Sequence, residues 1–142
     1  MHLSELMGRR VVSRASAETL GEVHDLFLSL APAAVSALQV GKGRKAGAVP
    51  WPSIVGIGPD AVIVSDDEAV APHPDAHSPR GRLLLSELGN EAGTVDDIEF
   101  DDATGRLIAV SSADTVITGD RLMADGPYAI IVAARPGDPF PG

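Results

Sequence analysis

The sequence predicts an all-β protein made of two small β-barrels in tandem. The heptad GPDAVIV at 58–64 returns as GPYAIIV at 126–132, and the pattern Gly-x-Val-x-Asp at 21–25 returns at 93–97. Short β-branched or apolar runs alternate with turn residues along the whole chain. Many short strands at this spacing are typical of a small barrel or sandwich, and the matched segments indicate an internal duplication.

The matched segments define the elements of each copy. The displacement is 72 residues for the strands that begin at Gly21 and Gly93, and 68 for the closing heptads. The second copy is therefore four residues shorter, within the stretch that holds GKGRKAG in the first. Predicted strands are 11–13, 22–30, 35–40, 46–50 and 61–64 in the first copy, and 83–85, 94–100, 106–111, 115–118 and 128–133 in the second.

The boundaries follow from composition. The first repeat spans 1–65, a proline-rich acidic linker spans 66–80, the second repeat spans 81–134, and 135–142 is a tail. Helix is expected at most as a turn near 50–56. Alternation of apolar and acidic residues in TVDDIEFD indicates one buried face. We predict core positions at Val23, Leu26, Leu28 and Ile63 in the first copy, and at Val95, Ile98, Phe100 and Ile131 in the second.

Composition limits the chemistry. The 142 residues include 44% apolar side chains, enough for a packed core, and no cysteine. Disulfides, thiol nucleophiles and thiolate metal sites are thereby excluded. No apolar run approaches the roughly 20 residues that a membrane helix needs, and the N-terminus lacks a long apolar stretch. We expect neither a membrane span nor a signal peptide, and a cytoplasmic location.

The net charge of −9 is unevenly distributed. Residues 1–64 carry +1, residues 65–80 carry −3 and residues 81–142 carry −7. A negative field repels phosphate backbones, which disfavours nucleic acid as a partner. A basic protein surface suits the acidic second half better.

Two acidic or histidine-rich stretches have the composition of a cation site. His73, Asp75 and His77 could bind a divalent metal, but a structural site needs four ligands in a folded frame, and we favour a linker. The second stretch, at 96–102, lacks the spacing of a calcium loop, and strand alternation places its acidic side chains on both faces of the strand. We therefore favour a solvated acidic face. We predict no metal and no cofactor. The acidic residues of this second stretch are Asp96, Asp97, Glu99, Asp101 and Asp102.

Other residues have two interpretations each. The basic cluster of Lys42, Arg44 and Lys45 between glycines could hold a phosphate, but no phosphate-loop pattern surrounds it, and we favour a hairpin tip. Trp51, between two prolines, is either core, which we favour, or an exposed interface anchor.

Asp25 and Asp97 occupy matched strand positions. They are either ligands or proton relays, or carboxylates that accept backbone N–H groups at a bulge, which we favour. An enzyme would need His24 and Asp25 to converge with other groups in a deep pocket.

Three motifs resemble the PRC-barrel domain. They are Ser-Glu-Leu-x-Gly at 4–8, Gly-x-Val-x-Asp at 21–25 and Val-Pro-Trp at 49–51. The family is named after the photosynthetic reaction centre H subunit and is also found in the ribosome maturation factor of the small subunit. The second copy keeps the aspartate motif at 93–97 but has no Val-Pro-Trp equivalent, so it resembles the family less.

The resemblance implies a non-catalytic adaptor that binds a protein partner through barrel surfaces. The alternatives are a small-ligand or metal-binding protein or enzyme, and a ribosome- or RNA-associated factor. Because a barrel of roughly 60 residues is marginal alone, we expect a monomer in which the two barrels pair about a pseudo-twofold axis. Candidate partner-binding residues are Trp51, Lys42, Arg44, Lys45, Asp97, Glu99 and Asp101.

Overall fold

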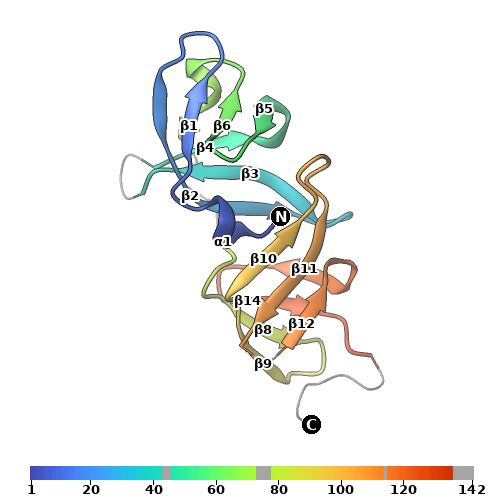
Figure 1. Cartoon of the computed structure of the whole chain (residues 1–142). Helices are drawn as coiled ribbons and strands as arrows, with labels where there is room; N and C mark the ends of the chain where they lie inside the picture. The colour runs from blue at the N-terminus through green and yellow to red at the C-terminus, as the bar shows by residue number, and fades with distance from the viewer. Residues whose placement is uncertain (43–45, 73–77, 114, 136–142) are drawn as a thin grey trace.

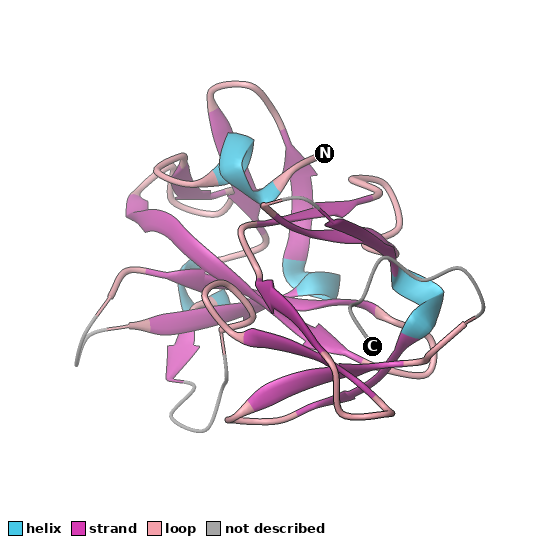
Figure 2. Cartoon of the chain, turned by 90° about the horizontal axis from the view of Figure 1, so that it is seen from below, coloured by secondary structure: helices cyan, strands magenta, loops and turns pink. Residues whose placement is uncertain are grey.

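Strands make up almost all of the regular structure (Figures 1 and 2). The computed structural model describes residues 1–42, 46–72, 78–113 and 115–135. The predicted all-β class is confirmed. The first half contains α1 (Leu3–Leu6), β1 (Arg10–Ser13), β2 (Thr19–Ser29), β3 (Ala34–Val40), β4 (Gly47–Pro50), η2 (Trp51–Ser53), β5 (Ile54–Ile57), β6 (Ala61–Val64), η3 (Asp67–Ala69) and β7 (Ala71–Pro72). The second contains β8 (Leu83–Ser86), β9 (Glu91–Thr94), β10 (Asp97–Phe100), β11 (Leu107–Ser112), β12 (Thr115–Thr118), η4 (Gly119–Arg121), β13 (Leu122–Asp125) and β14 (Ala129–Val132).

The strand pairings of the second half match those of the first. The first half forms one sheet in the order β5-β6-β1-β2-β3-β4-β7, and the second forms the sheets β13-β14-β8-β9 and β10-β11-β12. β1 runs parallel to β6 and β8 runs parallel to β14, and the other pairings are antiparallel. Equivalent register pairs include Arg10↔Ala61 with Leu83↔Ala129, and Asp25↔Gln39 with Asp97↔Ser111.

The structure differs from the predicted boundaries in three places. The predicted strand 94–100 is interrupted between β9 and β10, whereas β2 is continuous. The sequence patterns did not reveal α1, β5 or β13. Part of the stretch assigned to the linker belongs to the first sheet, because β7 pairs with β4 through Gly47↔Pro72 and Ala48↔Ala71.

One buried hydrophobic cluster includes side chains from both halves. Leu3 and Leu6 of α1 belong to it together with Ile98 and Phe100 of β10, and all four are 0% exposed. In Figure 1, α1 accordingly lies between the strands of the first half and β10. The two halves therefore share a core.

Five of the eight predicted core positions are buried, a sixth, Leu28, packs against the cluster, and two are wrong. Ile63 and Ile131 are only half-buried, because in β6 and β14 the residues on either side of them face the core. An entirely apolar strand does not reveal which of its faces is inside, and a phase shift of one residue exchanges the two. Leu28 is also half-buried. The confirmed positions are Val23, Leu26, Val95, Ile98 and Phe100.

Candidate interaction surface

The turns at the ends of two hairpins pair across the middle of the molecule. The Val35 amide donates to the Gly105 carbonyl oxygen at 2.7 Å, and the Leu107 amide donates to the Ala33 carbonyl oxygen at 3.0 Å. A displacement of 72 residues relates Val35 to Leu107 and Ala33 to Gly105. Each of the two hydrogen bonds is therefore the counterpart of the other. Ala34 and Arg106 face each other between them in an antiparallel bridge. Such reciprocity is the mark of a twofold contact between equivalent surfaces.

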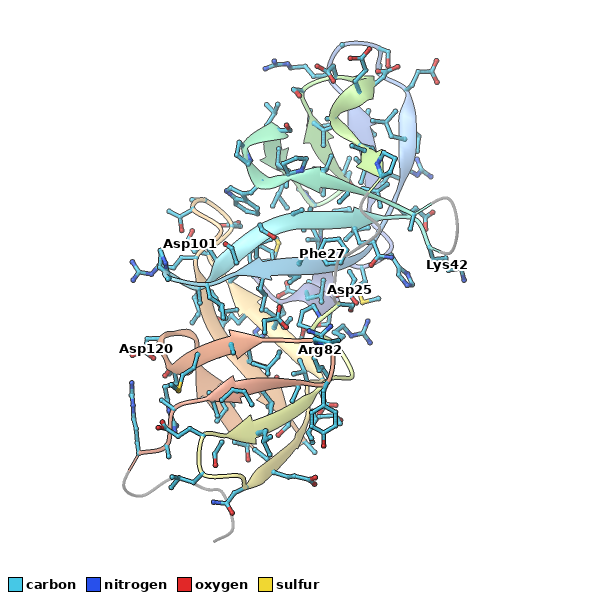
Figure 3. All side chains as sticks on the ribbon, turned by 180° about the vertical axis from the view of Figure 1, so that it is seen from behind. Asp25, Phe27, Lys42, Arg82, Asp101 and Asp120 are labelled. Carbon is cyan, nitrogen blue, oxygen red and sulfur yellow. The ribbon has the colours of Figure 1, made fainter. Side chains whose placement is uncertain are left out.

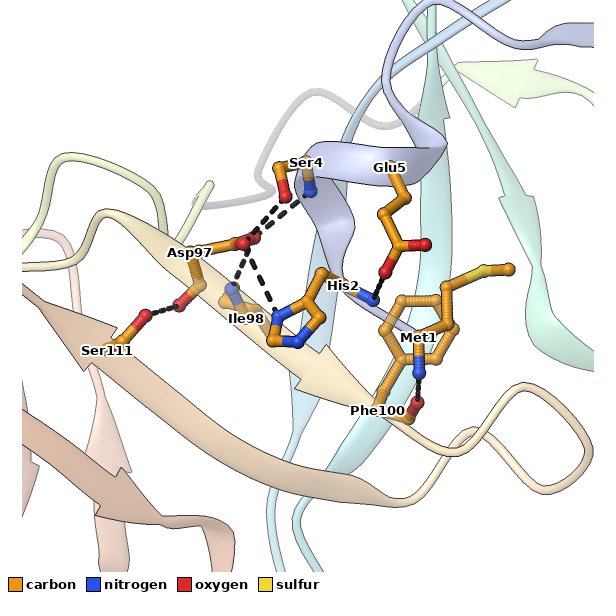
Figure 4. A network of polar contacts seen from close by, with 8 residues as sticks. All are labelled: Met1, His2, Ser4, Glu5, Asp97, Ile98, Phe100 and Ser111. Carbon is orange, nitrogen blue, oxygen red and sulfur yellow. Dashed lines mark hydrogen bonds and ion pairs between the residues drawn. The ribbon is translucent and has the colours of Figure 1, made fainter.

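The N-terminal segment is bound to β10 of the other half (Figure 4). The Met1 ammonium donates to the Phe100 carbonyl oxygen at 2.7 Å, and the Phe100 amide donates to the Met1 carbonyl oxygen at 2.8 Å. The Ser4 hydroxyl and amide donate to the Asp97 carboxylate at 2.7 and 3.0 Å. Nδ1 of His2 lies 3.4 Å from the same carboxylate. Residues 1–4 thus fasten the first half to the second.

The environment of Asp97 favours its ionised form. Partial burial by itself raises the pKa of this carboxyl group. Hydrogen bonds from the Ser4 hydroxyl and from the Ile98 and Ser4 amides, with the charge of His2, outweigh burial and hold the pKa below its ordinary value. The carboxylate therefore stabilises the contact between the halves at neutral pH.

Asp25 of β2 has a matching arrangement on the opposite side. Its carboxylate accepts hydrogen bonds from the Leu26 amide at 2.8 Å and from the Ser78 hydroxyl. Ser78 precedes β8, the first strand of the second half, as Ser4 precedes β1 of the first. Asp25 also lies where the β2–β3 register shifts. These bonds support the interpretation of Asp25 and Asp97 as structural carboxylates.

Trp51 contacts the second half through its ring. The Trp51 and Phe100 ring centroids are 6.1 Å apart with an interplanar angle of 86°, an edge-to-face arrangement. The indole is half-buried and packs against the shared core. This arrangement is closer to the core interpretation of Trp51 than to that of an exposed anchor.

The remaining predicted residues do not form one site. Lys42 is exposed at one end of the first sheet, far from Asp101 in Figure 3, and Arg44 and Lys45 lie outside the described residues. Asp101 accepts from the Ala103 and Thr104 amides at 2.8 and 3.1 Å, which hold its pKa below the ordinary value. Glu99 is half-buried, opposite His2.

Two of the cavities on the surface of the described residues are lined by both halves. One, of about 400 Å³, is lined by Asp25 together with residues 80–81 and 94–96, and His24 is not part of that lining. The other, of about 370 Å³, lies between the turn at 31–33, the start of β11 and η4.

Cation binding finds no support in the part of the chain that is described. Among those residues, no group of three or more His, Cys, Asp or Glu side chains could hold a metal ion. His73, Asp75 and His77 lie outside them. Among the same residues, none of the helices has the length and apolarity that crossing a bilayer demands.

Comparison with known proteins identifies the family. The model of the PRC-barrel domain matches residues 1–71. The chain belongs to the PRC-barrel domain family. No curated protein matches the chain. The match ends within β7, and the second half, which it does not cover, repeats strand registers of the first.

The sequence patterns missed three residues that shape these surfaces. Ser78 lies in no motif, and the motif that begins at Ser4 did not reveal its contact with Asp97, because the partners of these serines lie 53 and 93 positions away. Gly119 is the position that matches Trp51 at the displacement of 68. That signal was present in the sequence, where the second copy lacks a Val-Pro-Trp equivalent.

Proposed function

We propose that this PRC-barrel protein is a non-catalytic adaptor that binds a protein partner through the outer surface of its second half. The observation that carries the proposal is the exposure of large apolar side chains there. Among the described residues, six large hydrophobic side chains are exposed, and only Val55 belongs to the first half. Contiguous exposed apolar patches rimmed by polar residues mark interaction sites. The other five are Leu88, Ile108, Val116, Met123 and Tyr128.

The charge of the second half indicates the kind of partner. Residues 81–142 carry a net charge of −7, and Asp102, Glu91 and Asp120 are exposed. The Thr118 hydroxyl and Arg135 lower the pKa of Asp120, so its carboxylate is ionised at neutral pH. A basic surface on the partner would complement this field, and its attraction would weaken as salt rises.

Several residues that the sequence suggested for partner binding already have contacts within the chain. Asp97 is bonded to Ser4, and Trp51 packs against Phe100. Using either for a partner would require these contacts to break. We therefore place the partner surface on the exposed apolar and acidic side chains of the second half.

Affinity capture at two salt concentrations tests the adaptor function. The wild-type chain and a Glu91→Lys/Asp102→Lys variant are used as bait in extracts of the native cell, with bound proteins identified by mass spectrometry. We expect a basic partner that the wild type retains at low salt, releases at high salt and loses in the variant. Glu18→Lys/Asp60→Lys, which reverses two exposed acids of the first half, is the matched control and should retain the partner. Equal recovery by all three baits would refute the proposal.

A further inference from the structure

The cavity of about 370 Å³ lies where the two halves differ in an otherwise matched arrangement. Its walls are the turn at 31–33, residues 106–108 and residues 118–120, with Leu122 beneath. At the displacements of 72 and 68, the matching surface combines the turn at 103–105 of the second half with the indole of Trp51 of the first. The cavity therefore occupies the place of a tryptophan.

The side chains around the two places show what the indole covers. Trp51 of the first half packs edge-on against Phe100 of the second, which is 0% exposed. At the matching place Gly119 stands at the position of Trp51, and Leu28, the match of Phe100, is half-buried and does not line the cavity. Apolar side chains of the lining, among them Ile108 at 45% exposure, thus lack the cover that the indole gives Phe100.

The chain cannot supply this ring from position 119. A Cβ on Gly119 would lie 2.4 Å from the Leu107 carbonyl oxygen, a backbone atom that cannot move aside cheaply. Any side chain at this position would force η4 away from β11. The group that fills the cavity must therefore come from elsewhere.

We propose that the cavity binds an aromatic side chain of the partner protein, carried on a proline-flanked segment. This rests on the proposed adaptor function and names the chemistry of its ligand. The template is Pro50-Trp51-Pro52, in which Trp51 and Pro52 begin the 3-10 turn η2 and the indole packs against Gly105 and Phe100 of the second half. Proline on both sides restricts the backbone, which lowers the entropy lost on docking.

The rim of the cavity favours tryptophan with basic neighbours. Thr118 and Asp120 are exposed residues of its lining, and the Thr118 hydroxyl donates to the Asp120 carboxylate at 2.6 Å. A carboxylate is an acceptor for the indole N–H, which only donates. The same ionised group attracts lysine or arginine beside the aromatic residue, in agreement with a basic partner.

A peptide titration tests the site directly. The probe is acetyl-Lys-Pro-Trp-Pro-Lys-amide, and the comparison peptide carries alanine in place of tryptophan. Binding to the full chain is followed by calorimetry and by amide chemical shifts. We expect saturable binding of the tryptophan peptide, shifts of the Ile108 and Gly119 amides, and at least tenfold weaker binding of the alanine peptide. Equal affinity for the two peptides would overturn the proposal.

Variants locate the binding. Ile108→Asp places a charge on the exposed cavity wall and should weaken binding of the tryptophan peptide at least tenfold, as should Thr118→Arg in the lining. Val116→Asp, an equally drastic change of an exposed β12 residue outside the lining, should bind like the wild type. Unfolding curves identify a variant that fails to fold. If either Ile108→Asp or Thr118→Arg fails to fold, the remaining cavity variant tests the site. Unchanged binding in a folded cavity variant would refute the site.

Two further arms separate the explanations. The first arm uses Phe140→Ala, because Phe140 stands in a Pro-Phe-Pro sequence outside the described residues. If the peptide binds only to this variant, the ligand of the cavity is Phe140 of the chain itself, and the proposal of a partner ligand is overturned. The Ile108→Asp chain is also used in the affinity capture. If the captured partner is retained without loss while the peptide fails to bind, the cavity proposal fails and the adaptor function stands.

Discussion

The α-carbon of Gly105 lies against the indole of Trp51, so closely that a Cβ there would stand 2.8 Å from a ring carbon. Gly105 also has a φ of +80°, a conformation that side chains other than glycine adopt with strain. Its carbonyl oxygen accepts the Val35 amide. The glycine thus lets the hairpin of the second half approach both the tryptophan and a strand of the first.

Gly105→Ala should lower the free energy of unfolding by more than the backbone strain of alanine at this position. Strain at a positive φ costs about 1 kcal/mol, and displacement of the indole adds to it. Gly89→Ala is the matched control, because Gly89 has a φ of +89° and nothing within 4 Å of the added Cβ. Urea unfolding measures the free energy of each. Equal losses would show that the close approach to Trp51 contributes nothing.

Phe100→Ala should lower the free energy of unfolding by about 3–5 kcal/mol, because a fully buried ring is replaced by a cavity. Removing the ring also takes the edge-to-face partner from Trp51, so the tryptophan emission of the folded protein should change. Tyr128→Ala, at a side chain that is 74% exposed, should change stability by less than about 0.5 kcal/mol. A near-neutral Phe100→Ala would contradict the shared core.

Ser4→Ala should cost about 1 kcal/mol at neutral pH, because it removes a hydrogen bond to the Asp97 carboxylate. The pKa of Asp97 is lowered in the folded protein, so the stabilisation is complete above the unfolded pKa of about 3.9 and is lost as pH falls through the folded value. The difference between wild type and variant should therefore shrink below about pH 4.

Thermal unfolding across pH 2.5–7 measures this difference. Ser29→Ala, an exposed serine at the end of β2, should follow the wild-type curve at every pH. A constant difference between wild type and Ser4→Ala down to the lowest pH would rule out the carboxylate as the origin of the effect.

The two halves should depend on each other for stability. Residues 1–72 would expose the apolar face of α1, and residues 73–142 would expose Ile98 and Phe100, which pack in the same cluster. We expect each fragment alone to be destabilised or to self-associate, and an equimolar mixture to form a one-to-one complex, as measured by light scattering and circular dichroism. Two stable monomeric fragments that do not bind each other would contradict this expectation.

The interaction surface was only partly predictable. Trp51 and Asp97 stood out in the sequence as a lone tryptophan and a matched carboxylate, and the structure places both at the contact between the halves. Ser4 did not stand out, since a serine acquires its role only through a partner brought near by folding. Recognising the cavity beside Gly119 required both the sequence and the structure. The alignment of the two copies showed the missing tryptophan, and the structure showed how close Gly119 lies to Leu107.

The sequence by itself determined the all-β class, most of the strands and the register that relates the two copies, because these depend on local alternation and on matched spacing. Alternation with acids also identified the inner face at Ile98 and Phe100. Only the tertiary structure decided which face of the all-apolar strands is buried, placing Val62 and Val64 inside in place of Ile63. It also decided that residues 1–6 bind the opposite half, because that choice depends on contacts between segments more than 90 positions apart.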